Sequence, residues 1–116
     1  MIYYIYDGSF DGLLTAIYEA YYRHQEPEKI LRDGSIQDNL FIEHVYIKAD
    51  QQKAQRVYNA IVNKISPAAA KKVLYAFLSE AEDAATTIYR YLKLGFKLGK
   101  SVDSALADPY VFRVHF

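Results

Sequence analysis

The chain has 116 residues with fourteen basic and fourteen acidic side chains, and this balance gives no support to strong nonspecific nucleic-acid binding. The 52% hydrophobic content predicts one folded domain over residues 1–116 rather than a disordered chain. Cysteine is absent, which excludes a disulfide framework, a thiolate zinc site, an iron–sulfur cluster and a cysteine nucleophile.

The sequence also lacks the patterns of membrane attachment and secretion. No apolar run reaches the roughly 18 residues that a membrane-spanning helix needs. The first residues do not form the basic segment and apolar core of a secretory signal. We therefore expect a cytoplasmic protein with no membrane partner.

Strand-like and helix-like patterns alternate in the first half of the chain. Residues 2–6 are apolar on both faces, as expected for a strand covered on both sides. A turn at 7–9 precedes a helical pattern that should end near His24, because a proline follows and disfavours helical backbone before it. Short strands are predicted over residues 29–31 and 40–48.

The second half is predicted to be helical. Asp50 caps a second helix, and Ser66 followed by proline caps a third. Residues 79–82 read Ser-Glu-Ala-Glu, a capping box that would open a fourth helix ending at Gly99. These elements predict an α+β fold in which a small two- or three-stranded sheet is packed by about four to five helices.

Apolar stripes at helical spacing identify the expected core. The residues predicted to face inward are Phe10, Leu13, Leu14, Ile17, Tyr18 and Tyr21 in the first helix, Ala54, Val57, Tyr58, Ile61 and Ile65 in the second, Val73, Leu74, Phe77 and Leu78 in the third, and Ala85, Ile88, Tyr89, Leu92 and Phe96 in the fourth. Each stripe would bury one face of its helix.

The last residues form an unusual end for a domain. Asp108-Pro109 is a helix-start signal, and an apolar segment follows it up to Phe116 without a polar tail. The pattern predicts the start of a truncated helix over 108–116. We therefore expect the chain to be the N-terminal half of a longer protein.

The first candidate site is the turn between the first strand and the first helix. Free backbone N–H groups at a helix N-terminus can hold a phosphate, and two carboxylates can contribute to a divalent-cation site. The phosphate- or metal-binding candidates are Asp7, Gly8, Ser9, Asp11 and Gly12. The alternative is a capped helix with a glycine turn and no ligand.

The second candidate is a set of basic residues spaced along one side of the fourth predicted helix. The nucleic-acid-binding candidates are Arg90, Lys93, Lys97 and Lys100. The alternative is that these cations complement the negative end of the helix dipole, as Glu80, Glu82 and Asp83 would complement its positive end.

Tyrosine occurs twelve times, while tryptophan is absent. Tyr21 and Tyr22 are candidates for a docking surface, because tyrosine is enriched at interfaces. The alternative is that the tyrosines fill the core and its boundary. The three histidines lie far apart without metal-ligand spacing, so no metal site is predicted from them.

The opening segment YIYDGSFDGLLTAIYEAY, residues 4–21, carries a family resemblance that extends along essentially the whole chain. It resembles a bacterial family of DNA-metabolism and DNA-repair proteins encoded beside a radical-SAM protein for DNA modification or repair. Some family members are fused to a uracil-DNA-glycosylase-like domain. Members continue past residue 116 with a basic, aromatic segment similar to a nucleic-acid-facing or catalytic region.

The resemblance implies a role in DNA metabolism or repair, with DNA bound through the full-length protein and a radical-SAM protein as partner. It implies no cofactor in this chain, since the radical chemistry would belong to the partner. Two other functions stay open: a protein-interaction module without nucleic-acid contact, and a metal- or phosphate-dependent enzyme using the turn Asp7-Gly8-Ser9-Phe10-Asp11. No catalytic residue is identified, and neither enzymatic activity nor oligomeric state is predicted.

Overall fold

The computed structural model describes residues 1–34, 41–79, 81 and 83–104. They form two compact units, Met1–Val57 and Tyr58–Phe116, which are described separately. The predicted helix over 108–116, together with Glu80, Glu82 and His115, lies outside the described residues. Within the described residues, a three-stranded parallel sheet and four α-helices confirm the α+β class.

The elements agree with most of the predicted ones. In chain order they are β1 (Ile2–Tyr6), α1 (Phe10–Tyr22), β2 (Lys29–Arg32), β3 (Glu43–Tyr46), α2 (Gln51–Lys64), α3 (Pro67–Leu78), α4 (Ala84–Leu98) and a 3₁₀ segment, η1 (Gly99–Ser104). The chain passes from the first unit to the second within α2. No helix among the described residues is long and apolar enough to cross a membrane.

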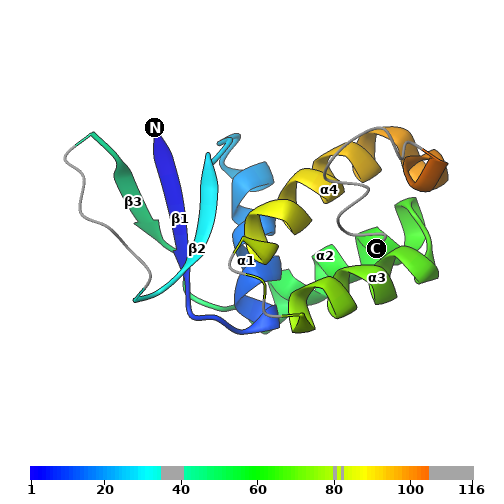
Figure 1. Cartoon of the computed structure of the whole chain (residues 1–116), viewed down its shortest axis with the longest axis horizontal. Coiled ribbons are helices and arrows are strands. Elements are labelled where there is room, and N and C mark those ends of the chain that lie inside the picture. The colour runs from blue at the N-terminus through cyan, green and yellow to red at the C-terminus, as the bar shows by residue number, and fades with distance from the viewer. Residues whose placement is uncertain (35–40, 80, 82, 105–116) are drawn as a thin grey trace. The chain divides into compact units, whose positions relative to one another are not determined.

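The sheet of the first unit has β1 at its centre, in the order β2-β1-β3 (Figure 1). Both pairings of β1 are parallel, and Tyr4 lies in register with Ile30 on one side and Val45 on the other. Parallel neighbours need a crossover connection, which α1 supplies between β1 and β2. α1 packs on β1, and Tyr4 and Ile30 are fully buried on that face of the sheet.

The third strand is shorter than predicted. A strand was predicted over residues 40–48 with Phe41, Val45 and Ile47 on one face, but β3 spans only Glu43–Tyr46 and the Phe41 side chain is 88% exposed. The reason is the register: Glu43 pairs with Ile2, the first residue of β1, so that Phe41 has no residue of β1 opposite it. Ile47, the residue after β3, is buried.

Burial extends around most of α1 rather than along one stripe. The sheet covers one side, and the start of α2 binds Thr15 and Glu19, two polar residues that are also buried. The predicted inward position of Tyr21 is wrong, since its side chain is 47% exposed. Tyr21 lies in the last turn of α1, close to the end of the helix.

In the second unit α3 packs on α4, and the start of α3 and the end of α4 carry the predicted signals. Ser66 caps α3 by accepting a hydrogen bond from Ala69 N, as predicted. Gly99 ends α4 with a left-handed φ of 63°, a conformation that favours glycine. Val73, Ile88 and Leu92 are buried as expected.

Two predictions for this unit are wrong. Leu78 is 60% exposed because it stands in the last turn of α3. The predicted helix start at 79–82 is wrong: Ser79 is the C-cap of α3 and its hydroxyl donates to Ala76 O at 2.6 Å. α4 instead begins at Ala84 after Asp83, whose side chain makes no capping hydrogen bond.

Candidate functional surfaces

The Asp7–Gly12 turn is a chain of hydrogen bonds that ends on the helix backbone. Asp7 Oδ1 accepts from both the backbone N–H and the hydroxyl of Ser9, at 2.9 and 2.6 Å. The Ser9 oxygen in turn accepts from Gly12 N at 2.9 Å, which makes Ser9 the N-cap of α1. These two hydrogen bonds from Ser9 hold the pKa of the Asp7 carboxyl below its ordinary value.

Glycine at position 12 is explained by the approach of this carboxylate. A Cβ atom on Gly12 would lie 2.2 Å from Asp7 Oδ1, closer than any real contact. Gly8 has a φ of 90°, which lets the chain turn tightly between strand and helix. Helix capping and turn geometry therefore explain the residue type at four of the six positions of the Asp-Gly-Ser-Phe-Asp-Gly segment, namely Asp7, Gly8, Ser9 and Gly12.

This geometry bears on the ligand hypothesis for the turn. The Asp7 carboxylate accepts from the N–H of Ser9, the N-cap of α1, and Ser9 Oγ accepts from Gly12 N, so both of these N–H groups are already bound by side chains of the turn. Asp11 is exposed in the first turn of the helix. No group of three or more potential metal ligands among His, Cys, Asp and Glu occurs within the described residues. The arrangement is thus that of a capped helix.

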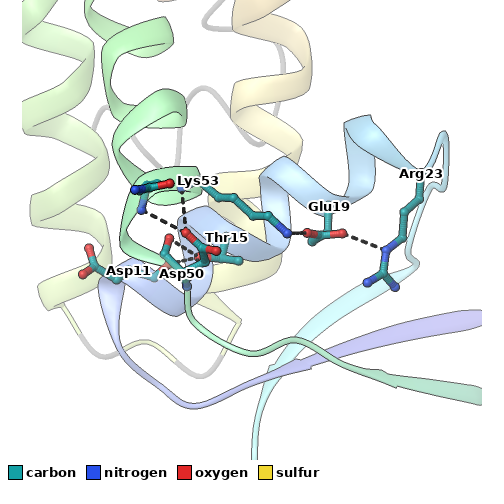
Figure 2. Close-up of polar contacts among 7 residues, drawn as sticks. Asp11, Thr15, Glu19, Arg23, Asp50 and Lys53 are labelled. Carbon is teal, nitrogen blue, oxygen red and sulfur yellow. Dashed lines mark hydrogen bonds and ion pairs between the residues drawn. The ribbon is translucent and has the colours of Figure 1, made fainter.

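Two buried polar residues, which the sequence patterns did not single out, join α1 to the start of α2 (Figure 2). The Thr15 hydroxyl accepts from Asp50 N at 3.0 Å and lies 2.7 and 3.1 Å from Asp11 O and Asp50 O. The Asp50 carboxylate caps α2 by accepting from the backbone N–H groups of Gln52 and Lys53. One hydroxyl thus links two helix N-termini.

The second of these residues is Glu19, one turn further along α1 (Figure 2). Its carboxylate is bound by Lys53 Nζ at 2.5 Å and by Arg23 Nε at 2.8 Å. Burial by itself would raise the pKa of Glu19, but the hydrogen bonds and charges of Lys53 and Arg23 outweigh burial and hold that pKa below its ordinary value. This network is internal to the first unit and holds the two helices together.

Tyr21 and Tyr22 reach the surface at the C-terminal end of α1. Tyr22 is 71% exposed and stacks on Tyr18, with ring centroids 5.9 Å apart. The Lys53 ammonium lies 5.5 Å from the Tyr18 ring. Partial burial, and secondarily the nearby charge of Glu26, raises the pKa of Tyr21. The two docking candidates are therefore accessible.

The basic candidates divide between two elements. Arg90, Lys93 and Lys97 lie on α4 at helical spacing, whereas Lys100 belongs to η1. The expectation of four cations on one helix is wrong for Lys100, because Gly99 ends α4 first. We use the term basic face for Arg90, Lys93, Lys97 and Lys100.

Two cations of the basic face share one aromatic ring. The Arg90 guanidinium and the Lys93 ammonium lie 5.6 and 5.7 Å from the centroid of Tyr89, which is buried in the second unit. Cation–π attraction orients both side chains, although their charges repel each other. Lys97 and Lys100 are exposed, and Lys97 also lies in the last turn of α4, where a cation complements the helix dipole.

The division into units separates charges that cancel in the whole chain. Residues 1–57 contain six basic and nine acidic side chains, a net charge of −3, and residues 58–116 contain eight basic and five acidic ones, a net charge of +3. Such an asymmetry is typical of chains in which one part contacts a polyanion. The net charge of zero for the whole chain therefore hides a negatively charged first unit and a positively charged second unit.

The described histidines do not form a site. His24 follows α1 with a left-handed φ of 53°. His44 stacks on Tyr3, and its Nε2 is buried without a hydrogen-bond partner among the described residues.

Comparisons with protein-family models, curated proteins and solved structures gave no match to this chain.

Proposed function

We propose that this protein is a cytoplasmic accessory factor in DNA metabolism or repair, and that it contacts the DNA backbone through its basic face. The single observation that carries the proposal is the net charge of +3 in the second unit, with Arg90, Lys93 and Lys97 at helical spacing on α4. The radical-SAM partner comes from the family resemblance of residues 4–21 and remains a part of the proposal.

The dimensions of the basic face suit a phosphate backbone. Lys97 stands seven positions after Arg90, and at 1.5 Å per residue the two lie about 10 Å apart along the helix axis. One DNA strand carries about three phosphates over that length. Three cations on α4 thus face a similar number of phosphates, and binding of this kind carries no sequence specificity.

The experiment is fluorescence anisotropy with single- and double-stranded DNA across a salt series. We expect binding that weakens with salt, the slope of log K against log salt changing by roughly 0.9 per phosphate contact on duplex DNA. The triple variant Lys93→Glu, Lys97→Glu, Lys100→Glu should lose this binding.

A matched control carries the same charge change on the first unit. Lys29, Lys48 and Arg56 are exposed there, and reversing them to Glu should leave most of the affinity. Equal loss in both variants would mean that only the total charge matters. Unchanged affinity in the α4 variant would remove the basic face from the proposal.

A second candidate function is docking of the partner enzyme by the first unit, favoured by the exposure of Tyr21 and Tyr22 at the end of α1. Copurification with the radical-SAM protein, lost in the Tyr21→Ala and Tyr22→Ala variants but not in Tyr75→Ala, would support it. Tyr75 is a suitable control because it is an equally exposed tyrosine in the second unit, 67% accessible.

A further inference from the structure

The chain contains three Asp-Gly pairs, Asp7-Gly8, Asp11-Gly12 and Asp33-Gly34. In such a pair the peptide nitrogen of glycine can attack the side-chain carboxyl carbon of the preceding aspartate, because glycine has no side chain to obstruct the approach. The new C–N bond closes a succinimide ring while the carboxyl group releases water. Ring closure needs a protonated carboxyl group, an accessible peptide nitrogen and a backbone that can rotate. The structure meets these requirements unequally at the three pairs.

The first pair is protected by the cap of α1. Asp7 Oδ1 accepts from the backbone N–H and the hydroxyl of Ser9, at 2.9 and 2.6 Å. These hydrogen bonds hold the pKa of the Asp7 carboxyl below its ordinary value, which disfavours the protonated form that releases water. Ring closure would also require the carboxyl group to leave Ser9. Asp7 is therefore expected to react slowly.

The second pair is protected by helical backbone. Asp11 and Gly12 lie in the first turn of α1, and the Gly12 N–H donates to Ser9 Oγ at 2.9 Å. A succinimide fixes the backbone of its aspartate outside the helical range, so the ring closes only after this turn of the helix has opened. Exposure of the Asp11 carboxylate is therefore not sufficient for reaction.

The third pair lacks both kinds of protection. Asp33 follows the end of β2, and both Asp33 and Gly34 are exposed. Within the described part of the chain, neither the Asp33 carboxylate nor the Gly34 nitrogen makes a hydrogen bond. Among those same residues, no atom beyond the chain neighbours of Gly34 lies within 4 Å of the position that a Cβ at this glycine would occupy. The carboxyl group and the attacking nitrogen are thus both accessible.

We propose that Asp33 is a modification site, at which aspartate converts spontaneously to isoaspartate through a succinimide formed with the Gly34 nitrogen. Water adds to the main-chain carbonyl carbon of residue 33 and breaks its bond to that nitrogen, so the chain continues through the former side chain. Addition of water to the other carbonyl carbon regenerates aspartate. One water is released and one is consumed, so the mass of the chain does not change and no co-reactant is needed.

The position of Asp33 allows the modified chain to stay folded. Its backbone N–H donates to Tyr6 O at 2.8 Å, next to the pairing of Tyr6 with Arg32. Isoaspartate adds its extra main-chain carbon after the α-carbon, on the side of Gly34, and leaves this N–H group in place. The pairing of β1 with β2 is therefore retained, and isoaspartate accumulates in folded protein. The site is independent of the proposed role in DNA metabolism.

Incubation of the folded protein in water labelled with heavy oxygen tests the proposal. Each passage through the succinimide adds one heavy oxygen to the aspartate or isoaspartate that forms. After several weeks at neutral pH, mass spectrometry of acid-protease peptides locates the label, and electron-transfer fragmentation distinguishes isoaspartate from aspartate. Label should accumulate at Asp33 at least about tenfold faster than at Asp7 or Asp11, which react only after local opening. Equal rates at the three residues, or an unlabelled Asp33, would overturn the proposal.

The unfolded chain is the reference for intrinsic reactivity. In urea the three pairs should acquire label at similar rates, because glycine follows each aspartate. A preference for Asp33 in urea as large as in the folded protein would assign the difference to local sequence and contradict the structural argument. A rate at Asp33 more than about tenfold lower in the folded protein than in urea would show that the fold protects this residue, against the proposal.

Two variants separate the sites. Asp33→Glu keeps the charge but would need a six-membered ring, which forms far more slowly, so label at this position should disappear. An isoaspartate-specific methyltransferase, which esterifies the new α-carboxylate, should then modify the incubated variant much less than the incubated unchanged protein. Ser9→Ala removes a hydrogen bond from Asp7 and should increase label at Asp7 without changing Asp33. Persistent methylation of the Asp33→Glu protein at the original level would place the isoaspartate elsewhere and overturn the proposal.

Discussion

Gly12 and the Asp7 carboxylate stand so close that no side chain fits between them: a Cβ at position 12 would lie 2.2 Å from Asp7 Oδ1. Gly12 is inside α1, where alanine is ordinarily preferred over glycine by about 1 kcal/mol. At position 12 the Asp7 carboxylate, five positions earlier in the chain, should therefore make glycine more favourable than alanine, the reverse of the general preference in helices.

The first prediction concerns this pair. Gly12→Ala should lower the free energy of unfolding by about 1–3 kcal/mol, because Asp7 must leave Ser9 to make room. In Asp7→Ala the same substitution should be neutral or stabilising. Urea denaturation of the two single variants and the double variant measures the coupling. Additive effects would show that the Asp7–Gly12 approach does not determine the preference for glycine.

Thr15 provides a second prediction. Thr15→Val keeps the shape of the side chain but leaves Asp50 N without the hydroxyl that binds it at 3.0 Å, so unfolding free energy should fall by about 1–3 kcal/mol. Thr15→Ser retains the hydroxyl and should lose less. Hydrogen exchange should show faster exchange at the first turn of α2 in Thr15→Val. Equal losses in both variants would assign the effect to packing of the methyl group.

Acid should destabilise the protein through Glu19 and Asp7. Both pKa values are lowered in the folded protein, so the unfolded chain binds protons at a higher pH than the folded one. Their contribution to stability is present above the ordinary carboxyl pKa, about 4, and is lost as pH falls through the lowered folded values. Urea denaturation between pH 6 and pH 2 should therefore show stability decreasing with acidification.

A variant identifies the contribution of Glu19 to this acid dependence. Glu19→Gln should flatten the pH dependence and lower stability at pH 7, because Lys53 and Arg23 lose their carboxylate partner. The exposed Glu28→Gln is the matched control and should change neither. A pH profile of Glu19→Gln that is parallel to that of the unchanged protein would contradict the assignment.

A close contact in the second unit gives a fourth prediction. A Cβ on Gly95 would lie 2.5 Å from Ile65 Cδ1, and Ile65 is fully buried. Gly95→Ala should therefore destabilise by about 1–3 kcal/mol, although it favours the helix. Ile65→Val removes the Cδ1 atom and should recover part of the loss in the double variant. Thermal unfolding of Gly95→Ala, Ile65→Val and the double variant measures this recovery. If the double variant is no more stable than the sum of the single effects predicts, the contact with Ile65 Cδ1 is not the source of the strain.

The candidate surfaces differ in how far the sequence predicts them. Asp50, Ser66 and Gly99 were predicted as caps because capping depends on residues within one turn. The helical spacing of Arg90, Lys93 and Lys97 in the sequence also predicted that they lie on one side of α4. The position of Lys100 depended on where that helix ends. Glu19 and Thr15 were not predicted, since their partners Lys53 and Asp50 are more than thirty residues away.

By itself the sequence determined the α+β class, the helices and most of their buried stripes, because periodicity and capping act over a few neighbouring residues. Only the tertiary structure decided the strand order, the register that leaves Phe41 outside the sheet, and the burial of Glu19. It also placed Glu28 and Glu43 on either side of Ile2 and divided a neutral chain into units of opposite charge. These features depend on pairings between distant segments, which no local pattern specifies.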